Sequence, residues 1–565
     1  MNHLPLLSVR CAVRWTRLVL LLFLLPASAS TLPNSAFNLT GFGNRATGGG
    51  VIPETDPAYR KVTNALDLAT ALVSSYKTAG SVKVIEITTN LDLGWLEIGS
   101  AAQTLASTPF RAHNSPQLHP RLLQTGVSLV DIKPRSGLTI FSPNGATIRH
   151  ATFNIKSCAN IIVRNLKFDE LWEWDESTKG QYDKNDWDFI DLGNGGAVSN
   201  IWVDHCTFTK SYDGILDTKA GSSAITISWC NYTGDDGATN ANSFVWQQIN
   251  SLESNRTSYP FYSFLRANGF SSTDIVTIIQ GHDKTHLAGA NNLDPANAML
   301  SMTFHHLWLQ NVWDRCVPRL RAGNVHDYNV CADMTGALAA KNLRNLRAAA
   351  MSAANQNTLN NTYDFDPPLN GAISTEGGAI LVEKSVYIDC LTPLRNNQTD
   401  PSNPAYTGKI LALDSIYEMN GAFFRGDSDA PGGSNTFGPL QAPIIPFSWN
   451  LPGNQLPYTY TMDDPSQLQS IVAEWAGAGV LDWNKTNWLL TTYGYAPPQI
   501  SSVAFSAGTL TVTIAGDTGP QYVLQASTNL VNWDNLVTNF APTPSFTWSN
   551  SVGAAGRFYR IKLGP

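Results

Sequence analysis

The chain has 565 residues, of which 43% are hydrophobic and only 14% are charged. This length is enough for one large domain and a smaller one, and the apolar content excludes disorder for most of the chain. Few charges together with 43 glycines favour a β-rich protein over a helical bundle. The formal net charge of −7 argues against a nucleic-acid partner, because no basic surface is available to neutralise phosphates.

The N-terminal segment has the features of a secretory signal. Three arginines precede an apolar run over 18–25, and Pro26 and the small residues of 27–29 follow it. Because this run is too short to span a bilayer, we expect a removable signal peptide over 1–29 rather than an uncleaved membrane anchor. Its removal takes away three arginines and no acid, so the net charge goes from −7 to −10. We expect a secreted mature protein, extracellular or periplasmic, without a membrane span.

A repeated pattern follows. Four segments fit one template in which apolar and polar residues alternate at the start: 160–168, 200–208, 224–232 and 301–309. Alternation indicates strands, and its recurrence between loops rich in Gly, Asn and Ser is typical of the rungs of a parallel β-helix rather than of a β-sandwich. We therefore predict an all-β fold, with a right-handed parallel β-helix over 30–496.

Stacked rungs would align one residue from each segment in an inward column: Leu166, Cys206, Cys230 and Leu307. The two cysteines would then lie about 4.8 Å apart, the spacing of neighbouring strands. That spacing permits either a disulfide or a stack of free thiols. Six cysteines remain after the signal peptide is removed, and none has zinc-type spacing, so we expect most of them to be small buried side chains.

Other segments depart from the repeat. Apolar residues in 62–79 recur with helical spacing, which suits a helix that caps the β-helix, and 337–355 also has a helical composition. The polar stretch 355–370 predicts a loop. Short alternating strands over 499–565 predict a small C-terminal β module of sandwich type.

Two pairs of carboxylates are the first candidates for chemistry. Asp186 and Asp188 share one face of an extended segment, and Asp213 and Asp217 follow in the adjoining turn of chain. Stacking would bring the pairs together, and four converging carboxylates repel one another unless a cation neutralises them. An oxygen-only ligand set suits calcium. The alternative is a set of solvated surface acids.

Basic side chains form a second group. Arg315, Arg319 and Arg321 lie within seven residues, and Lys284 precedes them. Because arginine binds carboxylates through two parallel hydrogen bonds, a basic wall opposite an acidic one suits a carboxylate-bearing chain. Structural salt bridges are the alternative.

These motifs together resemble the pectate lyase family of parallel β-helix polysaccharide lyases. The resemblance is carried by five segments: 41–49, 201–206, 212–217, 282–289 and 315–326. Their order and internal spacing match the family over 41–393, apart from inserts. The resemblance implies a calcium-dependent enzyme that cleaves polygalacturonate by β-elimination to 4,5-unsaturated oligogalacturonates. Its partner would be an acidic polysaccharide, and we expect a monomer.

The resemblance also implies residue roles. Asp188, Asp213 and Asp217 match the family's main calcium ligands, and Asp186 matches an auxiliary one. The roles of the other matching residues are these: Lys284 holds a substrate carboxylate, Arg315 is the general base, Arg321 binds substrate beside it, and Asp204 and His205 make structural hydrogen bonds. An arginine can serve as a base only where nearby positive charge lowers its pKa from above 12.

Two features depart from the family pattern. The family has one residue between its first arginine and the proline, whereas Cys316 and Val317 stand there in this chain. Counted back from Pro318, the base position falls on Cys316, so Arg315 needs a bulge to reach it. The second departure is an insert over 232–280, whose aromatic side chains we expect to wall the cleft: Trp246, Tyr259, Phe261 and Tyr262.

Two alternative functions stay open. One is a lyase of the same fold that acts on methylated pectin or another uronate, although the retained aspartates argue against a pectin lyase. The other is a non-catalytic β-helix that binds polysaccharide, favoured if Arg315 is displaced. The C-terminal module resembles β modules of exported bacterial enzymes, and its role could be glycan binding, surface attachment or sorting.

Overall fold

The structure of the protein is a computed structural model. It describes residues 37–50, 52–76, 81–113, 118–176, 187–211, 213–438, 440–481, 498–507, 509–516, 521–540, 545–551 and 557–563. The signal peptide expected over 1–29 and the candidate ligand Asp186 lie outside these residues. No described helix is both long enough and apolar enough to cross a membrane.

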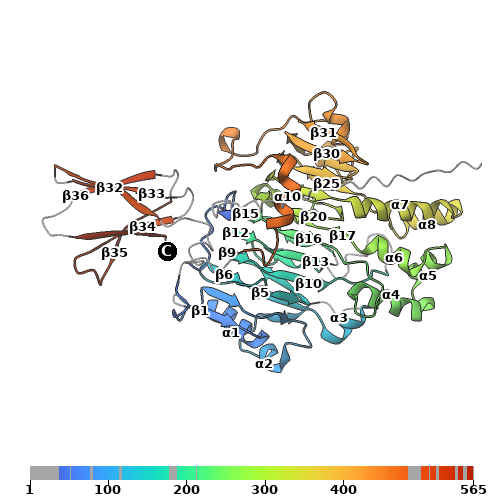
Figure 1. Cartoon of the computed structure of the whole chain (residues 1–565), viewed down its shortest axis with the longest axis horizontal. Coiled ribbons are helices and arrows are strands. Elements are labelled where there is room, and N and C mark those ends of the chain that lie inside the picture. The colour runs from blue at the N-terminus through green and yellow to red at the C-terminus, as the bar shows by residue number, and fades with distance from the viewer. Residues whose placement is uncertain are drawn as a thin grey trace, which may run out of the picture.

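Three long sheets, here named A, B and C, build most of the molecule (Figure 1). Sheet A has the strand order β1 (Tyr59–Val62), β2 (Val84–Ile87), β6 (Leu138–Phe141), β9 (Cys158–Arg164), β12 (Val198–Asp204), β15 (Ser223–Ser228), β19 (Ser301–His305), β23 (Asn324–Tyr328), β26 (Ala379–Glu383) and β29 (Lys409–Leu413). Sheet B has the order β3 (Leu91–Asp92), β7 (Thr147–Arg149), β10 (Lys167–Leu171), β13 (Thr207–Ser211), β16 (Asn231–Thr233), β20 (Trp308–Gln310), β24 (Cys331–Asp333), β27 (Val386–Ile388), β30 (Ser415–Met419) and β31 (Ala422–Gly426). Sheet C has the order β28 (Thr392–Arg395), β25 (Asn370–Thr375), β22 (Arg319–Arg321), β18 (His286–Ala288), β14 (Leu216–Thr218), β11 (Ile190–Leu192), β8 (Ala151–Ile155), β5 (Ser128–Ile132) and β4 (Phe110–Ala112).

The chain visits the three sheets in turn. One rung is β9, β10 and β11, and the next is β12, β13 and β14, each strand pairing in parallel with its counterpart one rung away. Only the end strands β4 and β31 pair antiparallel within these sheets. The predicted parallel β-helix is confirmed.

The turn from sheet A to sheet B has a common conformation. One residue at this corner adopts a positive φ in seven rungs: Asn165, His205, Trp229, His306, Asn329, Lys384 and Asp414. The first four stand at the sixth position of the repeated template. A left-handed residue at this position therefore marks the point where each rung bends.

The predicted inward column is also confirmed. Leu166, Cys206, Cys230 and Leu307 are buried, and they belong to the main hydrophobic core. Both cysteines are free, as are the other four cysteines that the structure describes. Of the two arrangements that the spacing permitted, the column contains the stack of free thiols.

Helices cover one end of the β-helix and one side of it (Figure 1). Their bounds are α1 (Ala65–Ser75), α2 (Gly99–Gln103), α3 (Pro120–Thr125), α4 (Phe244–Ser254), α5 (Pro260–Ala267), α6 (Ser272–Ile279), α7 (Thr335–Ala349), α8 (Ala353–Asn361), α9 (Gly433–Thr436) and α10 (Pro465–Trp475). The helices expected within 62–79 and 337–355 correspond to α1 and α7. The loop expected over 355–370 is wrong for its first part, because α8 continues to Asn361. The Ser352 side chain caps α8 by accepting a hydrogen bond from the Asn355 backbone N–H, and Leu359 is buried.

The insert over 232–280 forms α4, α5 and α6. Phe261 and Tyr262 are buried here, and Phe261 stacks on Trp174 at 5.0 Å and on Tyr363 at 4.4 Å between ring centroids. The expectation that these two aromatic side chains wall the cleft is therefore wrong. They form the interior of a helical layer, in which Asp274 of α6 also pairs with Arg347 of α7 at 3.0 Å.

The C-terminal module consists of two antiparallel sheets. One contains β32 (Gln499–Ser506), β33 (Thr509–Ala515) and β36 (Ser545–Ser551), and the other contains β35 (Asp534–Phe540), β34 (Gln521–Ser527) and β37 (Phe558–Leu563). Leu510, Val512, Ile514, Tyr522 and Leu524 form its own small core. This is the sandwich-type arrangement that the alternating pattern predicted.

Two buried aspartates have opposite surroundings. Asp204 accepts hydrogen bonds of 2.6 Å from Arg164 Nε, His205 Nδ1 and Ser228 Oγ, which is the structural role expected for it. Burial raises the pKa of this carboxyl, but its cationic and hydrogen-bonding partners outweigh burial and lower it. Asp327 lies in an interior column beside Phe304, and neither of its carboxylate oxygens has a hydrogen-bond partner among the residues that the structure describes. Burial therefore raises the pKa of Asp327 well above its ordinary value.

The Asp327→Asn variant should be more stable than the wild type at neutral pH. The native protein keeps a proton on Asp327 that the unfolded chain releases above about pH 4, so the free energy of unfolding falls by about 1.4 kcal/mol per pH unit above that point. Asparagine has no such proton. Thermal unfolding from pH 4 to pH 8 should show an advantage for the variant that grows as the pH rises.

The matched control is Asp204→Asn. Removing one partner of a buried ion pair costs about 3–5 kcal/mol, so this variant should be less stable than the wild type at neutral pH. A loss of stability in both variants would contradict the assignment of Asp327 as a buried carboxyl without partners.

Candidate active site

The candidate acidic residues lie at the start of sheet C strands or on them. Asp188 precedes β11, Asp213 lies in the bend between β13 and β14, and Asp217 is the central residue of β14. A Cβ atom built on Gly214 would lie 2.4 Å from Asp188 Oδ1 and 3.1 Å from Asp217 Oδ1. These two carboxylates therefore converge on the Gly214 backbone, and only glycine leaves them the space.

The third carboxylate has a different contact. Asp213 Oδ1 forms an ion pair with Lys284 Nζ, and both residues are largely buried. Asp217 Oδ1 accepts a hydrogen bond of 3.1 Å from the Leu287 backbone N–H, and its Oδ2 lies 3.3 Å from Lys219 Nζ. Lys284 thus joins the acidic group directly rather than standing apart from it.

The register of sheet C aligns acids and bases in one row. Asp191 pairs with Asp217, Asp217 with Leu287 and Leu287 with Arg319. Neighbouring strands are about 4.8 Å apart, so the backbones of Asp217 and Arg319 are separated by about 10 Å, with half-buried Leu287 between them. Asp217 and Arg319 are therefore held on one sheet without touching each other.

Arg315 is the residue whose placement depends on how the chain accommodates the extra residue before Pro318. It has a left-handed backbone, with φ at 56°, and its carbonyl accepts hydrogen bonds from the backbone N–H of His286 and the side chain of Thr285. Cys316 and Val317 are buried in the core. Burial also raises the pKa of the Cys316 thiol. The extra residue is thus absorbed inward, and Arg315 keeps a partly exposed side chain whose Nε is 3.6 Å from Asp314 Oδ2.

Arg321 is anchored more firmly. Its Nη1 donates to the backbone carbonyls of Gly289, at 3.0 Å, and Ala290. Its Nε lies 3.9 Å from Glu376 Oε1, a neighbour that the sequence motifs gave no reason to include. Burial lowers the pKa of Arg321, and the positive charge of Arg315 lowers it further.

Arg319 is a residue whose surroundings the sequence did not reveal. Burial, followed by the charges of Arg315 and Arg321, lowers its pKa to about 9. The three arginines are therefore close enough to repel one another. The spacing of Arg319 two residues before Arg321 in a strand was the available signal, because it places both side chains on the same face.

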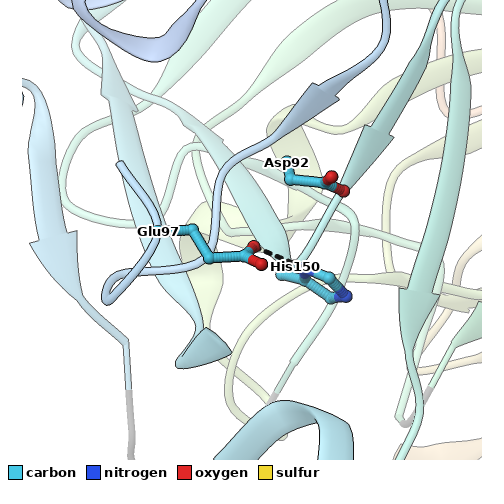
Figure 2. Close-up of side chains that lie close together, drawn as sticks. All are labelled: Asp92, Glu97 and His150. Atoms are coloured by element: carbon cyan, nitrogen blue, oxygen red, sulfur yellow. Dashed lines mark hydrogen bonds and ion pairs between the residues drawn. The ribbon is translucent and has the colours of Figure 1, made fainter. Parts of the chain in front are cut away.

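A second group of possible metal ligands lies on the sheet B side. Asp92, Glu97 and His150 have ligand atoms within 4.8 Å of one another (Figure 2), and this is the one such group in the described part of the chain. Nδ1 of His150 lies 3.2 Å from Glu97 Oε2, and Nε2 lies 3.2 Å from Glu170 Oε2. Burial lowers the pKa of His150, but the two carboxylates outweigh burial and raise it. Both ring nitrogens are already engaged, so this group is an ion-pair network.

The three candidate aspartates of the active site form no such group among the described residues. Asp188, Asp213 and Asp217 do not converge within 4.8 Å as a group of three. The arrangement is a close pair, Asp188 and Asp217, with Asp213 held by Lys284. Chemically, the site offers carboxylate oxygens at one end of the row and guanidinium groups at the other.

The fold is a parallel β-helix, and sheet C carries acidic side chains at one end of a row and arginines at the other. Such a surface suits a protein that binds an anionic polymer. A family model described as pectate lyase matches residues 20–242. Pectate lyase B of Paenibacillus amylolyticus is 50% identical over 381 residues, which cover 67% of this chain and 92% of that protein. The chain therefore belongs to the pectate lyase family, which is a family of lyase enzymes.

Solved and more distant relatives agree with this membership. The structure of a pectate lyase from Paenibacillus sp. 0602 matches with a TM-score of 0.74 and 50% identity, over 82% of this chain and 100% of that one. A pectate trisaccharide-lyase of Thermotoga maritima is 28% identical over 202 residues, which are 35% of this chain and 40% of that protein.

Proposed function

We propose that this protein is a calcium-dependent pectate lyase that cleaves polygalacturonate by β-elimination to 4,5-unsaturated oligogalacturonates. The observation that carries the proposal is the row of sheet C, which holds Asp217 and Arg319 on either side of Leu287 in a chain of the pectate lyase family. A sugar chain that bears carboxylates could interact with the guanidinium groups at one end of this row. We expect the enzyme to act as a secreted monomer.

Calcium would be held by Asp188, Asp213 and Asp217, with Asp186 as an auxiliary ligand. Two observations support this ligand set. All its donors are carboxylate oxygens, the type that calcium prefers, and Gly214 leaves open the space between Asp188 and Asp217. When bound, calcium withdraws charge from the substrate carboxylate and so acidifies the neighbouring C5 proton.

Arg315 is the proposed general base. It takes the proton from C5, the bond between C4 and the glycosidic oxygen breaks, and a double bond forms between C4 and C5. The leaving oxygen then takes a proton from solvent. The backbone at Arg315 supports this role, since it is left-handed and the side chain stays partly exposed despite the extra residue before Pro318.

Lys284 and Arg321 are the proposed substrate-binding residues. Fixed positive charges stabilise the negative charge that develops when the C5 proton leaves, and such preorganised electrostatics are commonly the largest catalytic term. The carbonyls of Gly289 and Ala290 hold the Arg321 guanidinium in place before substrate arrives, which supports such a role.

Activity should depend on calcium. We expect the mature protein, Ser30 to Pro565, to generate the ultraviolet absorbance of unsaturated product from polygalacturonate when calcium is added, and to stop when a chelator is added. Product from methylated pectin alone would favour the pectin lyase alternative. No product from either polymer, with binding retained, would favour the non-catalytic alternative.

The Gly214→Ala variant should bind calcium more weakly. A Cβ at this position would displace the Asp188 and Asp217 carboxylates, and such disturbance of a metal site lowers affinity by about 10–100-fold. The calcium concentration for half-maximal activity should rise accordingly. Gly269→Ala is the control, because Gly269 has a positive φ but open space around it, so its change should lower stability and leave the calcium response unchanged. An unchanged calcium response in Gly214→Ala would contradict the ligand assignment.

The Arg315→Lys variant should lose turnover but still bind calcium. Loss of a positioned base lowers kcat by about 10²–10⁴-fold, and the carboxylates lie on other strands. Steady-state kinetics and calcium titration would be compared with those of Arg347→Lys, which changes an arginine paired with Asp274 between α7 and α6. If Arg315→Lys kept full activity, Arg315 would not be the base.

A further inference from the structure

Arg319 is a buried cation without an anionic partner. Its residue is 8% exposed, and its Nη2 donates a hydrogen bond of 2.7 Å to Thr399 Oγ1. Among the described residues, its Nε has no hydrogen-bond partner. No described carboxylate lies within 4.0 Å of its guanidinium nitrogens, which is the limit for an ion pair. A charge removed from water without a partner is costly, so this arrangement needs an explanation.

Other buried arginines are better satisfied. Arg164 donates to Asp204 at 2.6 Å, and Arg344 donates to the Phe365 carbonyl at 2.6 Å and to Asn360. The charged neighbours of Arg319 are Arg315 and Arg321, which disfavour its charge, and the carboxylates of Asp314 and Glu376, whose opposite effect is smaller. With a pKa of about 9 it still carries that charge at neutral pH. Its surroundings are thus suited to an anion that the described part of the chain does not supply.

The position of Arg319 on sheet C indicates which kind of anion it binds. It pairs in register with Leu287, and Leu287 pairs with Asp217. Arg319 and Arg321 are two residues apart on β22, so their side chains share the outer face of sheet C, while Leu320 between them is buried in the core. An acidic polymer bound along this face passes over Arg319.

We propose that Arg319 binds a carboxylate of the galacturonate chain and thereby selects de-esterified units over methyl-esterified ones. The inference rests on the proposed function and deepens it. A methyl ester has no negative charge, so it loses the charge-assisted hydrogen bonds that a carboxylate makes to a guanidinium. Thr399 holds the guanidinium in place, which reduces the entropy lost when the carboxylate binds.

This role predicts opposite effects on binding and on stability. Replacing Arg319 by a neutral residue removes an unpartnered buried charge, so the folded protein should become as stable as the wild type or more so. The same change should weaken the binding of polygalacturonate. A purely structural arginine would behave differently, because its loss would destabilise the fold and leave the preference between substrates unchanged.

The test uses Arg319→Gln, Arg319→Met and Arg319→Lys. We expect both neutral variants to reduce the ratio of kcat/KM for polygalacturonate to kcat/KM for highly methylated pectin by at least about 10-fold, mainly through KM, with no loss of Tm. The lysine variant should fall between them and the wild type, because it keeps the charge but not the fork geometry. Arg344→Gln is the control, and it should lower the Tm without changing the ratio.

An unchanged ratio in the neutral variants, or failure of both to fold, would overturn the inference. The shift in Tm caused by oligogalacturonate needs no turnover, so it tests Arg319 independently of catalysis. If the wild-type protein shows that shift but no elimination, the proposed function fails. The role of Arg319 is then tested by the shift alone, which the neutral variants should lose. If elimination is normal and neither ratio nor shift depends on Arg319, only the inference about Arg319 fails.

Discussion

The strand register of the parallel β-helix is the constraint on which the rest of this structure depends. Each rung pairs residue by residue with the next, so the row that a residue occupies decides which distant residues become its neighbours. Asp191, Asp217, Leu287 and Arg319 span more than a fifth of the sequence, yet they occupy successive strands of sheet C. The left-handed residue at the corner between sheets A and B repeats in rung after rung and helps to keep this register.

Register also explains how opposite charges coexist on one surface. Acids and arginines on adjacent strands would form ion pairs and neutralise one another. In sheet C the strand of Leu287 separates Asp217 from Arg319 by about 10 Å, beyond the reach of an ion pair. The charges of Asp217 and Arg319 therefore do not neutralise each other. Asp213 and Lys284 are the contrast, because they lie close enough to pair directly.

Much of the fold could be predicted from the sequence because the relevant signals are local. Alternating residues and a shared template predicted the strands and the inward column from Leu166 to Leu307. The part of α8 after Asn355 was missed, since its sequence is polar and its stability comes from the Ser352 cap and one buried leucine, Leu359. Phe261 and Tyr262 of the insert were misplaced because aromatic character does not distinguish a cleft wall from a helical core.

The candidate site was only partly predictable for a related reason. Motif spacing identified the aspartates and arginines, but their contacts depend on how inserts of different length return the chain to sheet C. The space at Gly214, the pairing of Asp213 with Lys284 and the approach of Glu376 to Arg321 are consequences of that return. No local pattern contains them. The burial of Cys316 and Val317 in the core likewise could not be predicted from the spacing of the motif, because it depends on the path of the backbone.

Buried charges separate structural from functional roles in this molecule. Arg164 and Asp204 lie in the same rung system and satisfy each other, so they stabilise the fold and leave nothing for a ligand. Arg319 is also buried, but its hydrogen-bond partner is the Thr399 hydroxyl group, and the repulsion from Arg315 and Arg321 exceeds the attraction of Asp314 and Glu376. A fold can maintain such a group only if the stability gained elsewhere exceeds its cost, and the long continuous core of a β-helix provides that margin. The unpaired charge is then a property of the binding surface, because a carboxylate that arrives from outside gains the ion pair that none of the described residues supplies.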